Sequence, residues 1–301
     1  MKDYIVFTLG ANKQLAKDFA KFWNCPLGKV STIKFADGES LVKIATDVSD
    51  KDVIVIESMA KKPNDCLVQL LLLLDSINRS NARSITVIIP YLGYARQERA
   101  DEAFEPVSSE VVAKIIESGN YDKLMTIDLH HPVIETFYKR GIKNLSTTDV
   151  LANYFLSYLK DKGYSGKDVV VVSPDQGSNN RADRFVFAMR GAKKVVLEKF
   201  RPDKDQVLHY RLKGDVTNKV CIIIDDIIST GNTIASACRL LKKGGAKAVF
   251  VGASHGVFAK GAVEQIKKAG AKIIAVTNTI EQPAIDGVTC LDILPIIVEN
   301  L

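Results

Sequence analysis

Short runs of aliphatic and β-branched residues alternate with amphipathic stretches along nearly the whole chain. The run Asp52–Ser58 (DVIVIES) is typical of a buried strand, and Lys13–Trp23 has the spacing of an amphipathic helix. Ser31–Phe35 and Leu41–Ile44 flank an Asp-Gly pair, which predicts a hairpin. Strands that alternate with helices predict an α/β fold with a mainly parallel central sheet, flanked by helices, in each half of the chain.

The remaining elements follow from the same two patterns. Further strands are predicted at 4–9, 84–92, 123–129, 168–173, 194–199, 219–225, 248–253 and 272–277. Further helices are predicted at 66–77, 108–117, 148–161, 179–188, 233–243 and 259–269. Asn64 or Asp65 is the expected N-cap of the helix at 66–77.

A chain of 301 residues is long enough for two domains, since domains usually run about 100–200 residues. The break between the two halves falls in the loop near 143–148, which predicts domains at 1–147 and 148–287. No linker rich in Pro, Gly or Ser separates the halves, so we expect them to pack tightly.

Composition narrows the class of protein. Apolar residues make up 47% of the chain and charged residues 25%, as in an ordinary globular protein. The longest apolar run, at 67–74, is too short to span a membrane, so we expect no membrane segment. Five Cys without a CxxC pair argue against a disulfide framework and against structural zinc, which favours the reducing cytoplasm.

The charge balance is mildly basic. Lys and Arg number 41 against 35 Asp and Glu, for a net charge of +6, and the basic residues are dispersed. A nucleic-acid partner or a membrane surface is therefore not expected. A phosphorylated small substrate fits this balance equally well.

The stretch Val220–Ala237 (VCIIIDDIISTGNTIASA) carries the most chemistry. A buried strand ends in Asp225 and Asp226, and a turn of small and hydroxyl residues leads into a helix. Ligands of open α/β sheets bind at the carboxyl ends of strands, and a helix N-terminus offers free N–H groups to an anion. Carboxylates suit sugar hydroxyls, alone or through Mg²⁺, so the stretch predicts a phosphosugar site.

This stretch resembles the ribose-phosphate loop of the type I phosphoribosyltransferase fold. Five other segments narrow the resemblance to the ribose-phosphate diphosphokinase (phosphoribosyl-pyrophosphate synthetase) family, over nearly the whole chain. They are FADGE at 35–39, PYLGYARQER at 90–99, DLH at 128–130, SPDQG at 173–177 and KFRP at 199–202. Transferases that consume phosphoribosyl pyrophosphate share only the loop that follows Asp225.

The resemblance implies two phosphoribosyltransferase-like domains with the active site between them, and a C-terminal segment at 288–301 that returns to the N-terminal domain. It implies transfer of the diphosphoryl group of ATP to the anomeric hydroxyl of ribose 5-phosphate, with Mg²⁺ as cofactor and AMP as the second product. It also implies a cytoplasmic homo-oligomer whose ATP sites are shared between subunits.

The same resemblance assigns site residues. Those implied to bind ATP are Asp37, Glu39, Arg96 and Gln97. Those implied to bind ribose 5-phosphate are Asp225, Asp226, Ser229, Thr230, Gly231, Asn232 and Thr233. Lys199 and Arg201 are implied to be catalytic, on a mobile flap, and His130 and Asp175 to be associated with the metal. In isolation most of these residues have simpler interpretations, such as a hairpin turn or exposed cations.

The chain departs from the family pattern in two places. Residues 131–143 lack several of its usual side chains, and Ser229 and Asn232 stand where Asp and Gly are usual. Asn tolerates the left-handed backbone, so the turn can survive. Two alternatives follow: a non-catalytic regulatory homologue of a synthetase, and a phosphoribosyltransferase for base salvage. Retention of Glu39, Arg96 and both flap cations argues against the regulatory alternative.

Overall fold

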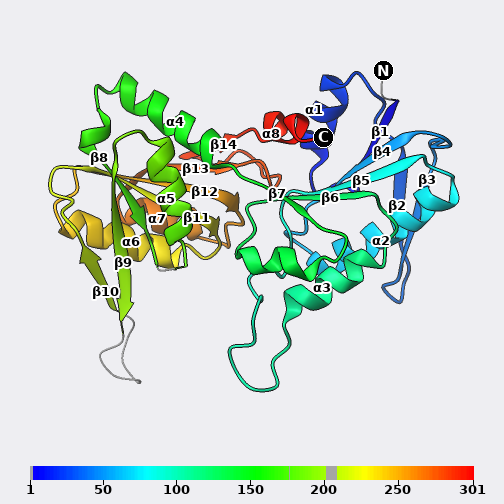
Figure 1. The fold of residues 1–301 in the computed structure, drawn as a ribbon, viewed down its shortest axis with the longest axis horizontal. Coiled ribbons are helices and arrows are strands. Elements are labelled where there is room, and N and C mark those ends of the chain that lie inside the picture. The colour runs from blue at the N-terminus through cyan, green and yellow to red at the C-terminus, as the bar shows by residue number, and fades with distance from the viewer. Residues whose placement is uncertain (1–2, 176, 201–208) are drawn as a thin grey trace. The chain divides into compact units, whose positions relative to one another are not determined.

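The computed structural model describes residues 3–175, 177–200 and 209–301, without the side chains of 199, 200, 209 and 210. The chain forms two α/β units (Figure 1). The first comprises Met1–Leu145, Thr279–Glu281 and Leu294–Leu301. The second comprises Ser146–Asn278 and Gln282–Ile293.

The first unit is built on a parallel five-stranded sheet. Its strands, in spatial order, are β1 (Tyr4–Phe7), β4 (Asp52–Ile56), β5 (Ser84–Ile89), β6 (Lys123–Ile127) and β7 (Lys143–Leu145). Its helices are α1 (Lys13–Phe22), α2 (Pro63–Arg79), α3 (Ser108–Glu117), the 3-10 helix η1 (Pro132–Phe137) and α8 (Leu294–Glu299). The β-branched residues of these strands fit a sheet that is covered on both faces.

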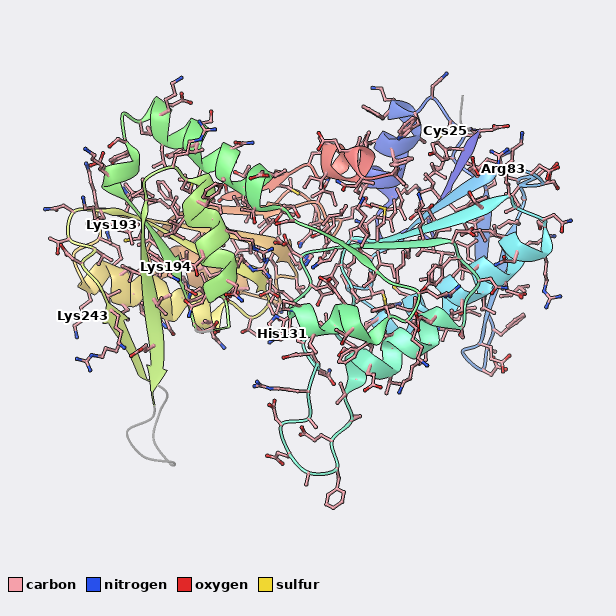
Figure 2. All side chains as sticks on the ribbon, viewed as in Figure 1. Cys25, Arg83, His131, Lys193, Lys194 and Lys243 are labelled. Carbon is pink, nitrogen blue, oxygen red and sulfur yellow. The ribbon has the colours of Figure 1, made fainter. Side chains whose placement is uncertain are left out.

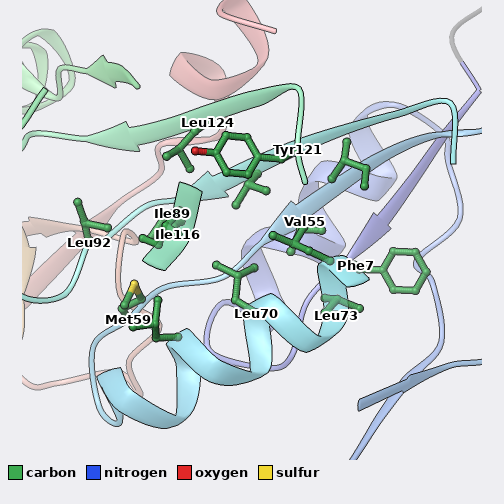
Figure 3. Close-up of a cluster of buried hydrophobic side chains, with 14 of the residues drawn as sticks. Phe7, Val55, Met59, Leu70, Leu73, Ile89, Leu92, Ile116, Tyr121 and Leu124 are labelled. Carbon is green, nitrogen blue, oxygen red and sulfur yellow. The ribbon is translucent and has the colours of Figure 1, made fainter. Parts of the chain in front are cut away.

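Alternate residues of each strand enter opposite layers of the first unit. Val55 and Ile89 point toward α2 and α3, where they pack with Leu70, Leu73 and Ile116 (Figure 3). On the other face, α1 contacts both β1 and α8 (Figure 1). The C-terminal helix therefore completes the layer that covers the first strands.

A separate antiparallel hairpin of β2 (Val30–Lys34) and β3 (Ser40–Ile44) contacts α2. Its turn contains Gly38 at a φ of +94°, a backbone conformation that suits glycine. The predicted hairpin is confirmed by this pairing.

The second unit contains a seven-stranded sheet that is parallel except at one edge. Its strands, in spatial order, are β10 (His209–Lys213), β9 (Lys193–Phe200), β8 (Val169–Ser173), β11 (Val220–Ile228), β12 (Ala248–Gly256), β13 (Ala271–Thr277) and β14 (Val288–Leu291). Its helices are α4 (Thr148–Asp161), η2 (Gly166–Asp168), α5 (Asn179–Ala188), α6 (Asn232–Lys243) and α7 (Ala262–Lys268). Only β10 runs antiparallel to its neighbour.

Two apolar layers enclose this second sheet. One joins α6 and α7 to side chains such as Ile223 and Val251. The other joins α4 and α5 to Ile222 and Phe250, with Phe155 stacked against Phe250 at 6.2 Å. The alternation of Ile222 and Ile223 between layers explains why β11 is apolar at every position from Val220 to Ile224.

The predicted α/β class, with a mainly parallel sheet in each half, is confirmed. Three short strands, β7, β10 and β14, were not predicted. β10 is an edge strand with exposed Arg211 and Lys213 and half-buried Leu212, and such one-sided burial weakens the apolar signal. The predicted N-cap of α2 is wrong. The helix begins at Pro63 and its N-cap is Lys62, because proline suits the first helical turn.

The C-terminal segment divides differently from the predicted 288–301. Val288–Leu291 pair with β13 and extend the second sheet, and only Leu294–Leu301 belong to the first unit. Thr279–Glu281 also belong to the first unit, where the Thr279 carbonyl accepts from Asn12 Nδ2 at 3.2 Å.

Candidate active site

The second sheet has a switch point between β8 and β11. These strands are neighbours, but the chain leaves β8 toward β9 on one side and later returns to β11 on the other. The connections diverge at the carboxyl ends of the two strands, which is where open α/β sheets bind ligands. Asp175 follows β8 at this end, and Asp225 and Asp226 lie near the end of β11.

Three carboxylates gather at the switch point. Asp225 Oδ1 accepts from Ser178 Oγ at 2.9 Å and from the Asp226 backbone N–H at 3.0 Å. Asp175 Oδ1 accepts from the Ser178 backbone N–H at 3.1 Å. Ser178 therefore bridges two of the predicted site residues. Sequence reasoning missed it, although it directly follows the SPDQG segment.

The surroundings of Asp225 disfavour its negative charge. Burial, followed by the charges of Asp226 and Asp175, raises the pKa of Asp225 well above its ordinary value. Asp226 is 4% exposed. Neighbouring carboxylates whose charges repel form a site suited to hydroxyl donors or a cation.

The turn after β11 forms a ready anion cradle. Gly231 has a φ of +80° and precedes α6, and a Cβ there would lie 3.1 Å from the Ala262 carbonyl oxygen. The first helical bond of α6 runs from the Ala235 N–H to the Gly231 carbonyl, at 2.8 Å. The N–H groups of Asn232, Thr233 and Ile234 precede that bond and are available to an anion.

The predicted ribose-phosphate residues thus occupy one continuous turn. Asp225 and Asp226 lie within β11, which extends to Ile228 rather than ending at the predicted 225. Ser229 and Thr233 are half-buried, and Thr230 and Asn232 are exposed.

The predicted catalytic pair lies mostly outside the described residues. Lys199 belongs to β9, opposite Tyr210 of β10, but its side chain is not described. Arg201 falls outside the described residues altogether. Figure 2 labels Lys193 and Lys194 at the start of β9, and Lys194 pairs with Asp183 of α5 at 2.6 Å.

The predicted ATP residues lie in the first unit. Asp37 and Glu39 are exposed at the hairpin turn, where Asp37 Oδ1 accepts from the Glu39 N–H at 3.1 Å. Arg96 is exposed, and within the described ranges it has no ion pair or hydrogen bond. Gln97 differs: its Oε1 accepts from Ser108 Oγ at 2.6 Å at the start of α3, which ties it to that helix.

His130 follows β6 and is exposed. The neighbouring His131, labelled in Figure 2, accepts from the Val133 N–H through Nδ1 at 3.2 Å and caps η1. His130 belongs to the first unit and Asp175 to the second, so their joint role at a metal stays a prediction.

The side chains that the structure describes do not form a closed metal cage. Within the described ranges, no three or more His, Cys, Asp and Glu side chains are grouped so as to hold a metal ion. Mg²⁺ commonly takes one or two protein carboxylates and completes its shell with water and substrate phosphates. The Asp175, Asp225 and Asp226 cluster, with its repelling charges, fits that manner of binding.

The divergent stretch 131–143 is a packed structural element. Ile134 is fully buried and Tyr138 is 4% exposed, both in the core of the first unit. Arg140 donates to the carbonyls of Glu117 and Gly119 at 2.7 and 2.6 Å, just beyond the end of α3. Residues of this stretch therefore support the fold of the first unit.

Comparison with known proteins covers the whole chain. Residues 4–119 match the family described as the N-terminal domain of ribose phosphate pyrophosphokinase, and residues 195–301 match the phosphoribosyl synthetase-associated domain. The chain is 35% identical to a ribose-phosphate pyrophosphokinase of Bacillus caldolyticus, over 98% of this chain and 93% of that protein. It is also 35% identical to a protein of the same name from Clostridium perfringens, over 100% of this chain and 94% of that one.

A solved structure agrees with these relatives. Phosphoribosylpyrophosphate synthetase from Mycobacterium smegmatis superposes with a TM-score of 0.91 at 31% identity, over 99% of this chain and 97% of that one. Among the described residues, no helix is both long and apolar enough to cross a membrane.

Proposed function

The chain belongs to the ribose-phosphate pyrophosphokinase family, and on that premise we propose that it converts ATP and ribose 5-phosphate into phosphoribosyl pyrophosphate and AMP. The relatives carry this name over nearly the full length of the chain, which favours a synthetase over the base-salvage and regulatory alternatives. In the reaction, the anomeric oxygen of the sugar bonds to the β-phosphorus of ATP. The bond from that phosphorus to the α,β-bridging oxygen breaks, AMP leaves, and the anomeric proton passes to solvent.

The end of β11 and the turn into α6 support the assignment of the sugar site. At the switch point of the second sheet, the carboxylates of Asp225 and Asp226 lead directly into a turn whose N–H groups are available to an anion. A ribose 5-phosphate has matching groups, with hydroxyls for the carboxylates and a terminal phosphate for the turn. Ser229–Thr233 would hold the phosphate, and Asp225 and Asp226 the ribose hydroxyls.

Diphosphoryl transfer depends on alignment and charge neutralisation more than on covalent catalysis. Lys199 and Arg201 are proposed to stabilise negative charge on the moving group, because cations held there act most strongly in the transition state. Asp37, Glu39, Arg96 and Gln97 are proposed to bind ATP. The exposed hairpin turn is consistent with a contact to a neighbouring subunit in a homo-oligomer.

Mg²⁺ is the proposed cofactor. When bound, it would supply positive charge to offset that of the phosphate groups. Asp175 and the carboxylates of β11 are the residues that fit it, and His130 is proposed to lie near the metal or a phosphate. A cytoplasmic location is proposed, which fits five Cys without a CxxC pair.

The test is AMP release from purified protein supplied with ATP and Mg²⁺, with and without ribose 5-phosphate. AMP that appears only with the sugar phosphate supports the proposal. ADP as the nucleotide product would indicate an ordinary kinase. No product, in a protein that binds both substrates, would favour a regulatory homologue.

A further inference from the structure

The ribose-phosphate turn is held by a second segment of the same unit. The Ile228 carbonyl accepts from the N–H groups of Val257 and Phe258, both at 3.0 Å. The Ser229 carbonyl accepts from the Ala259 N–H, also at 3.0 Å. These bonds run from the end of β12 to the end of β11, so the backbone of the turn rests on the chain that leads into α7.

Helix α7 continues this support along the turn. Gly231 lies so close to α7 that an added Cβ would contact the Ala262 carbonyl at 3.1 Å and the Ile266 side chain at 3.1 Å. One helical turn after Ala262, Gln265 Nε2 donates to Oδ1 of Asn232 at 2.7 Å. Gln265 is half-buried, which restricts its side chain more than an exposed position would.

This contact determines which end of the Asn232 amide is available. Oδ1 is engaged by Gln265, whereas Nδ2 has no hydrogen-bond partner among the described residues. Asn232 is the first residue of α6, beside the backbone N–H groups that face an anion. A side-chain NH₂ at this position adds a neutral donor to the backbone cradle.

We infer that Gln265 is a positioning residue for the sugar-phosphate site: it orients the Asn232 amide so that Nδ2 donates to the phosphate of ribose 5-phosphate. This inference rests on the proposed function and extends it to a residue outside the motif. Gln265 acts only through Asn232 and does not touch the substrate itself.

Steady-state kinetics of a small set of variants tests the inference. Gln265→Met keeps the side-chain length but cannot donate. It should raise the KM for ribose 5-phosphate about 3- to 10-fold, while kcat and the KM for ATP change less than about twofold. Gln14→Met is the matched control, since Gln14 makes a similar bond, to Asp18 at 2.9 Å, on exposed α1 of the first unit. It should leave all three constants unchanged.

Gln265→Glu separates orientation from tethering. A glutamate can only accept, so it keeps the bond by drawing Nδ2 of Asn232 toward itself and turning Oδ1 toward the phosphate. The melting temperature should stay close to that of the wild type, but the KM for ribose 5-phosphate should rise more than in Gln265→Met. A Gln265→Glu enzyme with an unchanged KM would overturn the inference.

A double-mutant cycle tests whether Gln265 acts through Asn232. Asn232→Ala should raise the KM for ribose 5-phosphate at least as much as Gln265→Met, and adding Gln265→Met to it should have no further effect. Fully additive effects would contradict the inference, as would a Gln265→Met enzyme in which kcat and both KM values worsen together.

Failure of the proposed function would be seen separately, as absence of AMP from the wild type. Titration calorimetry with ribose 5-phosphate would then make the same comparison through binding, with the same expected order of affinities. A wild type that binds no ribose 5-phosphate would overturn both proposals.

Discussion

Asp225 shows the conflict between binding and stability at a single residue. Its carboxylate accepts from Ser178 and from the Asp226 N–H, yet two further carboxylates repel it, and its pKa is raised. A carboxyl whose pKa is raised on folding lowers the stability at neutral pH, because the unfolded chain releases its proton more readily. A ligand that supplies hydroxyl donors or positive charge would relieve this repulsion.

Asp225→Asn should therefore stabilise the ligand-free protein and weaken the site. The amide can still accept from Ser178 and no longer repels Asp226, so the free energy of unfolding should rise by about 1 kcal/mol at neutral pH. The KM for ribose 5-phosphate should rise at least tenfold. Thermal unfolding and AMP-release kinetics measure the two effects.

The control is Asp183→Asn. Asp183 pairs with Lys194 on exposed α5 and lies outside the carboxylate cluster. This variant should not be stabilised and should keep its ribose 5-phosphate kinetics. A destabilised Asp225→Asn protein, or one with wild-type kinetics, would contradict the account of the cluster.

Glu57 is a buried carboxylate with a structural role. It is 3% exposed at the end of β4 and accepts from the N–H groups of Leu9 and Ala11, at 2.8 and 3.2 Å. It also accepts from the Thr8 hydroxyl at 3.1 Å. Burial nevertheless raises the pKa of Glu57 above its ordinary value of 4.5.

This shift has a defined pH signature. A raised pKa means that the folded state holds the proton more tightly than the unfolded chain, so stability is lost as the pH rises from about 4.5 through the raised pKa. Glu57→Gln does not titrate and so lacks this pH-dependent loss of stability, but it has one hydrogen-bond acceptor fewer, which lowers its stability by about 1 kcal/mol. The free energy of unfolding of the wild type should therefore exceed that of Glu57→Gln, and this gap should be largest at pH 4 and smallest at pH 7. Denaturant unfolding across this range measures the gap, and a gap that widens with pH would contradict the assignment.

At the scale of elements, contiguous features were predictable and contacts across elements were not. The turn from Asp225 to Thr233 could be found because its carboxylates, glycine and hydroxyls stand together in the sequence. Ser178 and Gln265 join the site only through pairing of β8 with β11 and packing of α7 on the turn, so no local pattern marks them. Gln97 stays a predicted ATP-binding residue, and its bond to Ser108 adds a role in anchoring α3, which the sequence pattern did not indicate.

The stretch after β6 contains another contact across elements that no local pattern marks, and this one concerns stability. Arg140 donates to the carbonyls of Glu117 and Gly119, and to that of Tyr121 at 3.1 Å, and its guanidinium lies 4.0 Å from the centre of the Tyr121 ring. It therefore hydrogen-bonds the last carbonyl of α3 and two carbonyls of the loop beyond the helix, and its guanidinium also contacts an aromatic ring.

Arg140→Ala should lower the free energy of unfolding by about 2 kcal/mol, because it removes several charged hydrogen bonds together. Arg79→Ala is the matched control, since Arg79 forms an exposed ion pair with Asp75 on α2, and the stability of this variant should be unchanged. Urea unfolding compares the two. Equal stability of Arg140→Ala and Arg79→Ala would show that the Arg140 bonds contribute nothing measurable.

At the scale of the whole molecule, the similarity to the family extends over both units. The relatives match 98% or more of the chain, as a two-unit synthetase requires. A base-salvage enzyme would need only the turn at the switch point of one sheet. Two phosphoryl groups are therefore expected to move as one unit from ATP to the sugar.

Following the β-phosphorus of ATP tests this claim most directly. The protein is incubated with Mg²⁺, ribose 5-phosphate and ATP labelled at the β-phosphorus, and the products are separated. The account predicts that the label moves to the sugar product in the same amount as unlabelled AMP is formed. Label retained in ADP, with a sugar product that has gained a single phosphoryl group, would show γ-phosphoryl transfer and contradict it.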